Sequence, residues 1–301
     1  MSTREAPGPG GLVVVDKPGG ITSHDVVARI RRLAQTRRVG HGGTLDPMAT
    51  GVLVVGVERA TRLLTYVVGS RKRYVATIRL GQTTHTDDAE GELTGGADAS
   101  AITEEALRGG LAALTGGIDQ VPSAVSAIKV DGKRAYARVR AGEEVTLEPR
   151  RVTVYSLELG ALRRTAPGLL DLDIEVECSS GTYIRAIARD LGAALNSVGG
   201  HLTALRRTAV GGFTLAEAST LDELAALDDP VTLPLPVAVA RLLPRRDADS
   251  EQARTLAHGG PLPAIGIEGP YGVFDPAGAV VAIVSERDGR ARPDVVLVGG
   301  G

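Results

Sequence analysis

The sequence predicts an α/β protein of two domains, and three observations support this. Strand-like runs, in which apolar residues alternate or continue unbroken, are mixed with segments of helical periodicity. The composition changes after about residue 218, where prolines and glycines separate short strand-like runs. A chain of 301 residues is long enough for about two domains, one with a sizeable core. We therefore expect a larger α/β domain and a small β-domain that begins near residue 238.

The first elements expected are a strand and a helix joined by a Pro-Gly turn. They lie in "GLVVVDKPGGITS", which ends in Thr22 and Ser23, two residues that can cap a helix. Apolar residues then recur at helical spacing from Val26 to Leu33. Next comes the glycine-rich stretch "GHGGTLDPMATG", residues 40–51, which leads into the buried-strand pattern "VLVVGV". Glycines at this density let the backbone turn sharply or lie close to another molecule.

Later elements of the first domain follow from the same periodicities. A strand is predicted in "YVATIRLGQ", which alternates from Tyr74, and a helix with a capping box at Thr103 is predicted in "TEEALRGGLAAL". The clearest alternation, "LLDLDIEVEC" at residues 169–178, predicts a half-exposed strand. It runs into "SSGTYIRAIARDLGAAL", whose apolar stripe predicts a helix with Arg185 near its start.

The composition excludes several classes of protein. Apolar residues make up 43% and charged residues 23%, which is ordinary globular usage. The apolar runs are too short to span a membrane, and the polar N-terminal stretch lacks a hydrophobic signal region. The single Cys178 has no partner for a disulfide or a thiolate metal site, and we expect a buried structural thiol. These features favour a soluble cytoplasmic protein.

The net charge of −2 conceals a clustered distribution of basic residues. Such clusters occur in "RIRRLAQTRR", "GSRKRY" and "KVDGKRAYARVR". Each alone is more often a solvated face than a binding site, but several together are also the footprint of a nucleic-acid-binding protein. Both interpretations stay open at this point.

Standard catalytic constellations are missing from the sequence. The glycine-rich stretch lacks the Gly-Lys-Ser/Thr ending of a Walker A loop, the histidines stand apart, and no Gly-x-Ser-x-Gly elbow occurs. What remains is a carboxylate, Asp46, on a stiff Leu-Asp-Pro step within the glycine-rich stretch. From spacing alone, a turn-capping role for Asp46 is favoured over a chemical one.

Five blocks of sequence between residues 11 and 215 resemble the bacterial tRNA pseudouridine-55 synthases of the TruB type, and they occur in that family's order. The blocks are "VDKPGGITSHDVV", "RRVGHGGTLDPMATGVLVVGVERATRL", "KRYVATIRLGQTTHTDDAEGE", "VPSAVSAIKVDGKRAYARVRAGE", and "ECSSGTYIRAIARDLG" with "HLTALRRTAVGGF". One departure is Gly42, where many relatives carry Thr. The resemblance implies an isomerase that flips the T-loop uridine at position 55 of tRNA and converts it to pseudouridine, without metal or cofactor.

The resemblance also implies the domain organisation. It suggests a catalytic domain over residues 1–237, built around a mixed, mainly antiparallel sheet, with a basic RNA-gripping insertion at about 122–151. A PUA-like RNA-binding β-domain would occupy residues 238–301. The expected partner is tRNA, bound through its T-arm by a monomer, with no membrane association.

Three residues receive catalytic roles from the resemblance. Asp46 matches the family nucleophile, and Arg185 matches the arginine that pairs with it and keeps it ionised. Tyr74 matches the tyrosine that stacks on the target base and can move a proton. The alternatives are a core tyrosine at Tyr74 and a surface arginine at a helix start for Arg185.

A second set of residues is implied in RNA binding. His41 matches a histidine that fills the space vacated by the flipped base. The remaining members of the set are Lys17, Tyr183, Leu205, Lys133, Arg134 and Arg138. Packing roles for Lys17, Tyr183 and Leu205, and simple solvation of the three basic residues, remain alternatives.

Two other functions compete with the isomerase. The first is a tRNA-binding or tRNA-folding module in which catalysis is incidental. The second is a carboxylate-based glycosidase, which needs a second carboxylate facing Asp46. No motif in the sequence supplies that second carboxylate.

Overall fold

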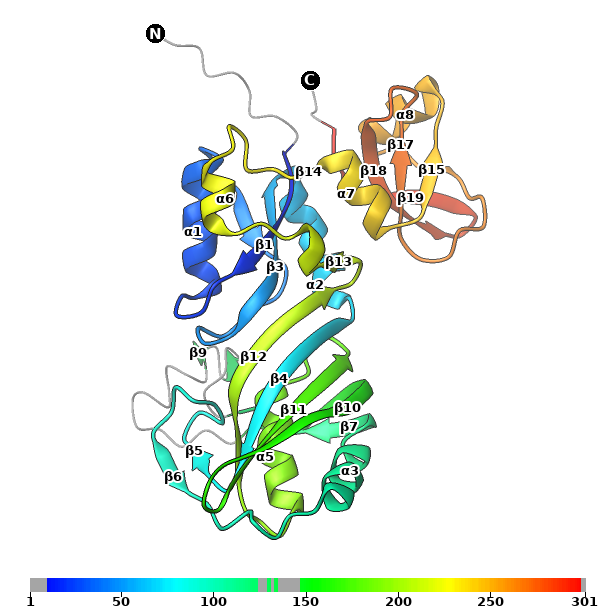
Figure 1. Ribbon diagram of the computed structural model, residues 1–301. Helices are drawn as coiled ribbons and strands as arrows, with labels where there is room; N and C mark the ends of the chain where they lie inside the picture. The colour runs from blue at the N-terminus through cyan, green and yellow to red at the C-terminus, as the bar shows by residue number, and fades with distance from the viewer. Residues whose placement is uncertain (1–9, 124–128, 131–132, 135–146, 299–301) are drawn as a thin grey trace. The chain divides into compact units, whose positions relative to one another are not determined.

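The computed structural model describes residues 10–123, 129–130, 133–134 and 147–298 (Figure 1). The chain forms two compact units. The first unit joins three segments, Met1–Asp46, Gly51–Val68 and Val210–Gly301, and the second comprises Pro47–Thr50 and Gly69–Ala209. None of the helices in the described part of the chain has the length and apolar content that a membrane crossing requires.

The first unit is centred on two buried strands. β1 (Gly10–Lys17) pairs antiparallel with β3 (Thr50–Glu58), which also pairs with β2 (Val39–His41), and β14 (Leu233–Pro234) flanks β1. Residues 12–15 of β1 and 52–55 of β3 are unbroken apolar runs, because both faces of these strands are covered. In Figure 1, α1 (Ser23–Leu33) and α6 (Leu221–Ala225) lie on one side of these strands, and α7 (Leu235–Leu242) lies on their other side.

The start of α1 confirms the predicted cap. Thr22 is the N-cap, and its hydroxyl accepts a hydrogen bond from the Asp25 backbone N–H while the Asp25 carboxylate accepts one from the Thr22 backbone. The hydrogen bonds from Thr22 lower the pKa of Asp25. The apolar stripe that begins at Val26 is buried through Ile30. Short elements that follow β3 are η1 (Arg59–Leu63) and α2 (Leu64–Gly69).

The C-terminal part of the first unit has its own five-stranded sheet. Its strands lie in the order β15 (Arg245–Asp247), β17 (Tyr271–Phe274), β18 (Val280–Arg287), β19 (Arg290–Val296) and β16 (Leu262–Pro263). β15 and β17 pair in parallel, and the other pairs are antiparallel. α8 (Ser250–Ala257) covers a small core that contains Leu256, Tyr271 and Val284.

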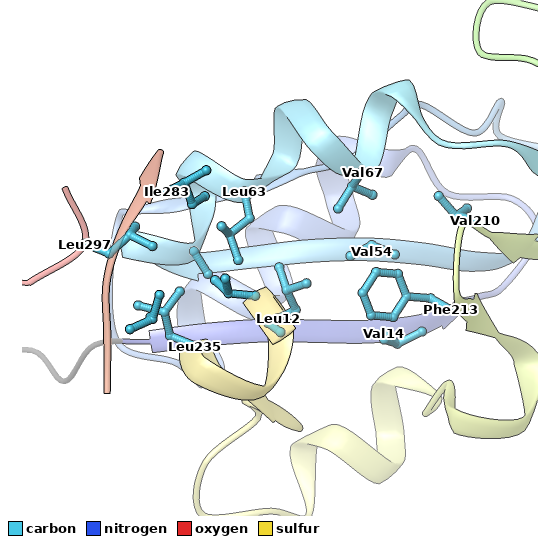
Figure 2. Close-up of a cluster of buried hydrophobic side chains, with 14 of the residues drawn as sticks. Leu12, Val14, Val54, Leu63, Val67, Val210, Phe213, Leu235, Ile283 and Leu297 are labelled. Atoms are coloured by element: carbon cyan, nitrogen blue, oxygen red, sulfur yellow. The ribbon is translucent and has the colours of Figure 1, made fainter. Parts of the chain in front are cut away.

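A second cluster joins this C-terminal sheet to the strands at the start of the chain. Figure 2 shows Ile283 and Leu297 in one buried cluster with Leu12 and Val54. The guanidinium of Arg59 also donates to the Leu297 carbonyl at 2.9 Å. The predicted domain boundary at 237–238 falls within α7, and it remains a prediction.

The second unit is a sheet covered by two helices on one face. Its strands lie in the order β12 (Gly200–Val210), β4 (Lys72–Leu80), β11 (Leu169–Cys178), β10 (Arg150–Ala166) and β7 (Gly116–Gln120). From β4 to β7 every neighbouring pair is antiparallel. α3 (Glu104–Ala113) and α5 (Ile184–Ala194) pack against the sheet and each other, and a Cβ on Gly110 would lie only 2.7 Å from Leu191. The lack of a side chain at Gly110 therefore allows α3 and α5 to pack closely.

The two faces of this sheet follow the predicted alternation. Apolar residues of β4 and β11 point to the helices and are buried, whereas the alternate residues form ion pairs on the open face. Asp171 differs from the expected exposed position, since only 6% of it is accessible. The cause is Arg79, whose Nε and Nη2 cover its carboxylate at 2.7 and 2.8 Å.

One predicted detail is wrong. Thr103 does cap α3, because its hydroxyl accepts a hydrogen bond from the Ala106 backbone N–H at 3.2 Å. The reciprocal half of a capping box cannot form, since alanine at that position has no side chain to reach back. The remaining short elements are β5 (Thr83–Thr84), β6 (Leu93–Gly95), β8 (Lys129–Val130), β9 (Lys133–Arg134), β13 (Phe213–Thr214) and η2 (Leu215–Glu217).

Candidate active site

The glycine-rich loop between β2 and β3 is anchored just before Asp46. The Ser23 hydroxyl donates to the Leu45 carbonyl at 3.0 Å and accepts from the Leu45 N–H at 2.8 Å. Both residues are buried. Asp46 follows this fixed point, Pro47 restricts it to extended conformations, and the residue is partly exposed. The loop therefore holds a carboxylate within reach of a ligand.

Glycines in the loop have identifiable backbone and packing roles. Gly43 in the loop and Gly51 at the start of β3 have φ values of 104° and 98°, a region that disfavours side chains. Gly42 is limited by space instead, because a Cβ there would lie 2.5 Å from Cγ1 of Val67 in α2. Glycine at position 42, where many relatives carry Thr, therefore accompanies close packing of the loop against α2.

The other predicted site residues of the first unit are Lys17 and His41. Lys17 ends β1, is fully buried, and its Nζ donates to the Pro18 carbonyl at 2.9 Å. His41 ends β2 opposite Val55, and its ring meets that of His24 edge-to-face with centroids 5.4 Å apart. Lys17 and His41 therefore join Asp46 in the first unit.

Arg185 lies in the first turn of α5 and is 5% exposed, which excludes the surface alternative. Its Nη1 donates to the Thr86 carbonyl at 2.8 Å, and its Nε lies 3.6 Å from Oδ2 of Asp88. Asp88 is itself 2% exposed. Burying a guanidinium is costly unless such acceptors accompany it. The loop containing Thr86 and Asp88 therefore fixes the position of Arg185.

Asp88 is the site residue that sequence reasoning missed. Its Oδ1 accepts from the Thr86 hydroxyl at 2.5 Å and from the Glu90 N–H at 3.1 Å. In the sequence it is one of several acidic residues in "HTDDAEGE", and nothing in that pattern distinguishes a buried carboxylate from a solvated one. The only usable signal was its place within one of the blocks that resemble the family.

Three other predicted residues of the second unit have buried or capping positions. Tyr74 is 7% exposed on the inner face of β4, and Leu205 is 8% exposed on the neighbouring β12. Tyr183 is the N-cap of α5, where its N–H donates to Oε1 of Gln120 at 2.7 Å and its carbonyl accepts from Nε2 at 3.0 Å. Core packing therefore remains an alternative for Tyr74 and Leu205.

A buried lysine and the single cysteine are direct partners across β4 and β11. Burial and the nearby Arg207 lower the pKa of Lys72 to about 8. Burial raises the pKa of Cys178 to about 11. The prediction of a buried thiol is confirmed. Lys72 was not singled out by its sequence pattern.

Three predicted RNA-binding residues fall in the segment around β8 and β9. Lys133 and Arg134 form β9, which pairs antiparallel with β8. Their side chains, and the whole of Arg138, lie outside the described residues.

Sequence comparison places the chain among known proteins. Residues 31–184 match the N-terminal domain of the TruB family pseudouridylate synthases. The chain belongs to the TruB family. Residues 185–231 match the C-terminal domain described as that of tRNA pseudouridylate synthase B, and residues 243–298 match the one described as tRNA pseudouridine synthase II, C terminal. The predicted family and enzyme class, an isomerase, are confirmed.

Full-length relatives support the TruB assignment. A protein of Rhodococcus jostii is 56% identical, and the alignment covers 99% of this chain and 98% of the relative. A protein of Thermobifida fusca is 57% identical, and the alignment covers 96% of this chain and 99% of the relative. Both relatives are named tRNA pseudouridine synthase B.

Solved structures of more distant proteins share the TruB fold. A chain in a Cbf5–Nop10–Gar1 complex matches with a TM-score of 0.71 and 27% identity, covering 96% of this chain and 85% of that one. A chain in an H/ACA RNP bound to a substrate RNA containing 2′-deoxyuridine matches with a TM-score of 0.70 and 25% identity, covering 96% of this chain and 85% of that one. The predicted α/β fold with a mainly antiparallel sheet and a small C-terminal β-domain is confirmed. The match of residues 243–298 makes that domain a TruB C-terminal domain.

Proposed function

We propose that this chain is a tRNA pseudouridine synthase. The observation that carries the proposal is the anchored Leu-Asp-Pro loop, which presents a partly exposed carboxylate in a member of the TruB family. Relatives named tRNA pseudouridine synthase B align over nearly the whole chain, which supports tRNA as the substrate.

We further propose that the target is the T-loop uridine at position 55, bound through the T-arm by a monomer. The reaction breaks the C1′–N1 bond and forms a C1′–C5 bond, while C5 loses a proton and N1 gains one. Atoms and electrons balance within the nucleotide, so the net reaction is an isomerisation. Flipping the base out of the RNA costs a few kcal/mol, and binding must supply that free energy.

Catalytic roles are proposed for Asp46, Tyr74 and Arg185. The Asp46 carboxylate either traps the electron-poor sugar or adds to the uracil ring, and both routes stay open. Tyr74 stacks on the base and moves a proton. The proposed role of Arg185 is to favour the ionised form of the Asp46 carboxylate, as a guanidinium does for a carboxylate. Thr86 and Asp88 hold the Arg185 guanidinium in a fixed orientation.

RNA binding is proposed for a larger set of residues and for the C-terminal β-domain at 238–301. His41 fills the space that the flipped base leaves. The other proposed binding residues are Lys17, Tyr183, Leu205, Lys133, Arg134 and Arg138.

The first test is to incubate the purified protein with an unmodified tRNA transcript, without nucleotide and with a chelator, and to map pseudouridine. We expect one pseudouridine, at position 55, and none in a transcript with cytidine there. Modification at another position would overturn the T-loop assignment, and no modification of the transcript would overturn the function.

The second test replaces the proposed nucleophile. Asp46→Asn keeps the size of the side chain and removes its charge, so we expect normal tRNA binding and no product. The matched control is Asp119→Asn, which alters an exposed carboxylate paired with Arg151. Turnover by Asp46→Asn within about tenfold of wild type, a barrier change of only about 1.4 kcal/mol, would remove Asp46 from the nucleophile role.

A further inference from the structure

Two arginines one turn apart on α5 contact successive residues of one loop. Figure 1 labels α5 in the second unit. Arg185 contacts Asp88, as described above. Arg189 contacts the preceding residue, since its Nη1 donates to Oδ2 of Asp87 at 3.3 Å. Its Nη2 donates to the Val121 carbonyl at 2.7 Å, so one guanidinium joins the loop to the residue that follows β7. The planar fork of an arginine suits such a bridge.

The loop adopts an unfavourable backbone conformation at the point that Arg189 holds. Asp87 has φ of 60°, in the left-handed region that few non-glycine residues occupy. Its carbonyl accepts from the Leu202 N–H of β12 at 3.0 Å. Strained residues of this kind persist only where their surroundings hold them. The contacts from Arg189 and Leu202 supply that restraint.

We propose that Arg189 is a positioning residue for the isomerisation. By holding Asp87, it keeps the loop in the conformation in which Thr86 and Asp88 fix Arg185. This inference rests on the proposed function, because it assumes that Arg185 acts in the reaction.

Magnitudes separate this role from ordinary stabilisation. The Arg189 side chain is 30% exposed, and ion pairs at such positions contribute at most about 1 kcal/mol to stability. A misplacement of about 1 Å in a catalytic group, by contrast, costs up to about a hundredfold in rate. Loss of Arg189 should therefore affect the rate far more than the stability.

The first experiment compares Arg189→Met with wild type in single-turnover assays on a tRNA transcript. We expect a rate about ten- to a hundredfold lower, with the tRNA dissociation constant and the melting temperature nearly unchanged. Arg189→Lys should recover part of the rate, because an ammonium keeps the charge beside Asp87 but lacks the fork. The control is Arg108→Met, which breaks an exposed ion pair on α3. Equal rates for Arg189→Met and wild type would overturn the inference.

A double-mutant cycle tests whether Arg189 acts through Asp88. Asp88→Asn is made in the wild-type and Arg189→Met backgrounds. If the loop transmits the effect, Arg189→Met should cost little once Asp88 is already replaced, because coupled residues are not additive. Fully additive losses would show that Arg189 acts by another route.

Amide hydrogen exchange gives a readout that does not depend on activity. Peptides spanning residues 85–92 should exchange faster in Arg189→Met, while those from α3 should not change. Unchanged exchange in the loop would contradict the proposal even if the rate fell. If wild type makes no pseudouridine, the proposed function fails, whereas the exchange result still tests the restraint on the loop.

Discussion

At the scale of single residues, Tyr74 combines a buried ring with a hydroxyl that can be removed separately. Tyr74→Phe keeps the packing on β4. If the hydroxyl moves a proton, we expect the single-turnover rate to fall about a hundredfold, within the range of positioned acid–base groups, with tRNA affinity retained. A wild-type rate would leave Tyr74 a stacking or packing role. Tyr74→Ala is less informative, because removing a buried ring costs about 3 kcal/mol of stability.

The partners Lys72 and Cys178 predict an unusual dependence of stability on pH. The pKa of Lys72 is about 8 in the folded protein, against an ordinary value of 10.5. Above about pH 8 the folded state therefore binds fewer protons than the unfolded state, and stability rises with pH. The pKa of Cys178 is about 11, against 9.0, so its contribution lowers stability as pH rises from 9.0 to about 11.

Urea unfolding between pH 7 and pH 10 tests these two opposing effects. From these two groups, we expect the free energy of unfolding to increase between about pH 8 and 9 and then to level off. Lys72→Met should abolish the increase, and Cys178→Ala should extend it toward pH 10.5. An increase that survives in Lys72→Met would have to arise from another group.

At the scale of elements, the approach of the glycine-rich loop to α2 makes position 42 sensitive to volume. Gly42→Thr places a Cβ 2.5 Å from Val67, and we expect a loss of about 1–3 kcal/mol of stability, typical of overpacking. Gly42→Thr combined with Val67→Ala should recover part of the loss. Chemical denaturation measures both. No recovery in the double variant would assign the loss to loop conformation instead.

The sequence predicted best those elements whose periodicity is set by burial on one face. The strands at Tyr74 and at residues 169–178, and the caps at Thr22 and Thr103, follow from local pattern alone. The helix Leu235–Leu242 was not predicted, because the prolines around it are typical of a loop. Pro234 and Pro236 in fact lie at its start, where proline is tolerated.

Site residues were predictable only where a local motif marked them. Asp46 lies in a distinctive loop and could be singled out. Asp88 gains its place from a contact with Arg185, far along the chain, and Arg189 from contacts with two further segments. Such contacts exist only after folding, so no periodicity in the sequence could reveal them.

At the scale of the whole molecule, the shared cluster complicates any deletion of residues 238–301. Removing Ile283 and Leu297 would uncover Leu12 and Val54, so a truncated chain would test folding as much as RNA binding. Surface changes avoid this problem. Replacing the exposed Arg290 and Arg292 of β19 by Ala should weaken tRNA binding and flatten its salt dependence, because phosphate contacts release counterions.

The measurement is log affinity against log salt concentration. The control replaces Arg108 and Arg163, two exposed arginines of the second unit that lie outside the proposed RNA-gripping insertion, by Ala. Each lost phosphate contact reduces the slope by about 0.9 at most. An unchanged slope for the Arg290 and Arg292 variant would argue against RNA binding by this face of the C-terminal sheet.

The discontinuity of the first unit constrains the order in which the chain folds during translation. Gly69–Ala209, nearly all of the second unit, leaves the ribosome as one stretch and can fold while synthesis continues. β1 and β3 emerge earlier, yet Ile283 and Leu297, which complete their buried cluster, are made only after the whole of Gly69–Ala209. The segment that carries Asp46 is thus translated early, but its buried cluster is completed only when the C-terminal sheet has been made. Until then its apolar strands remain open to chaperones.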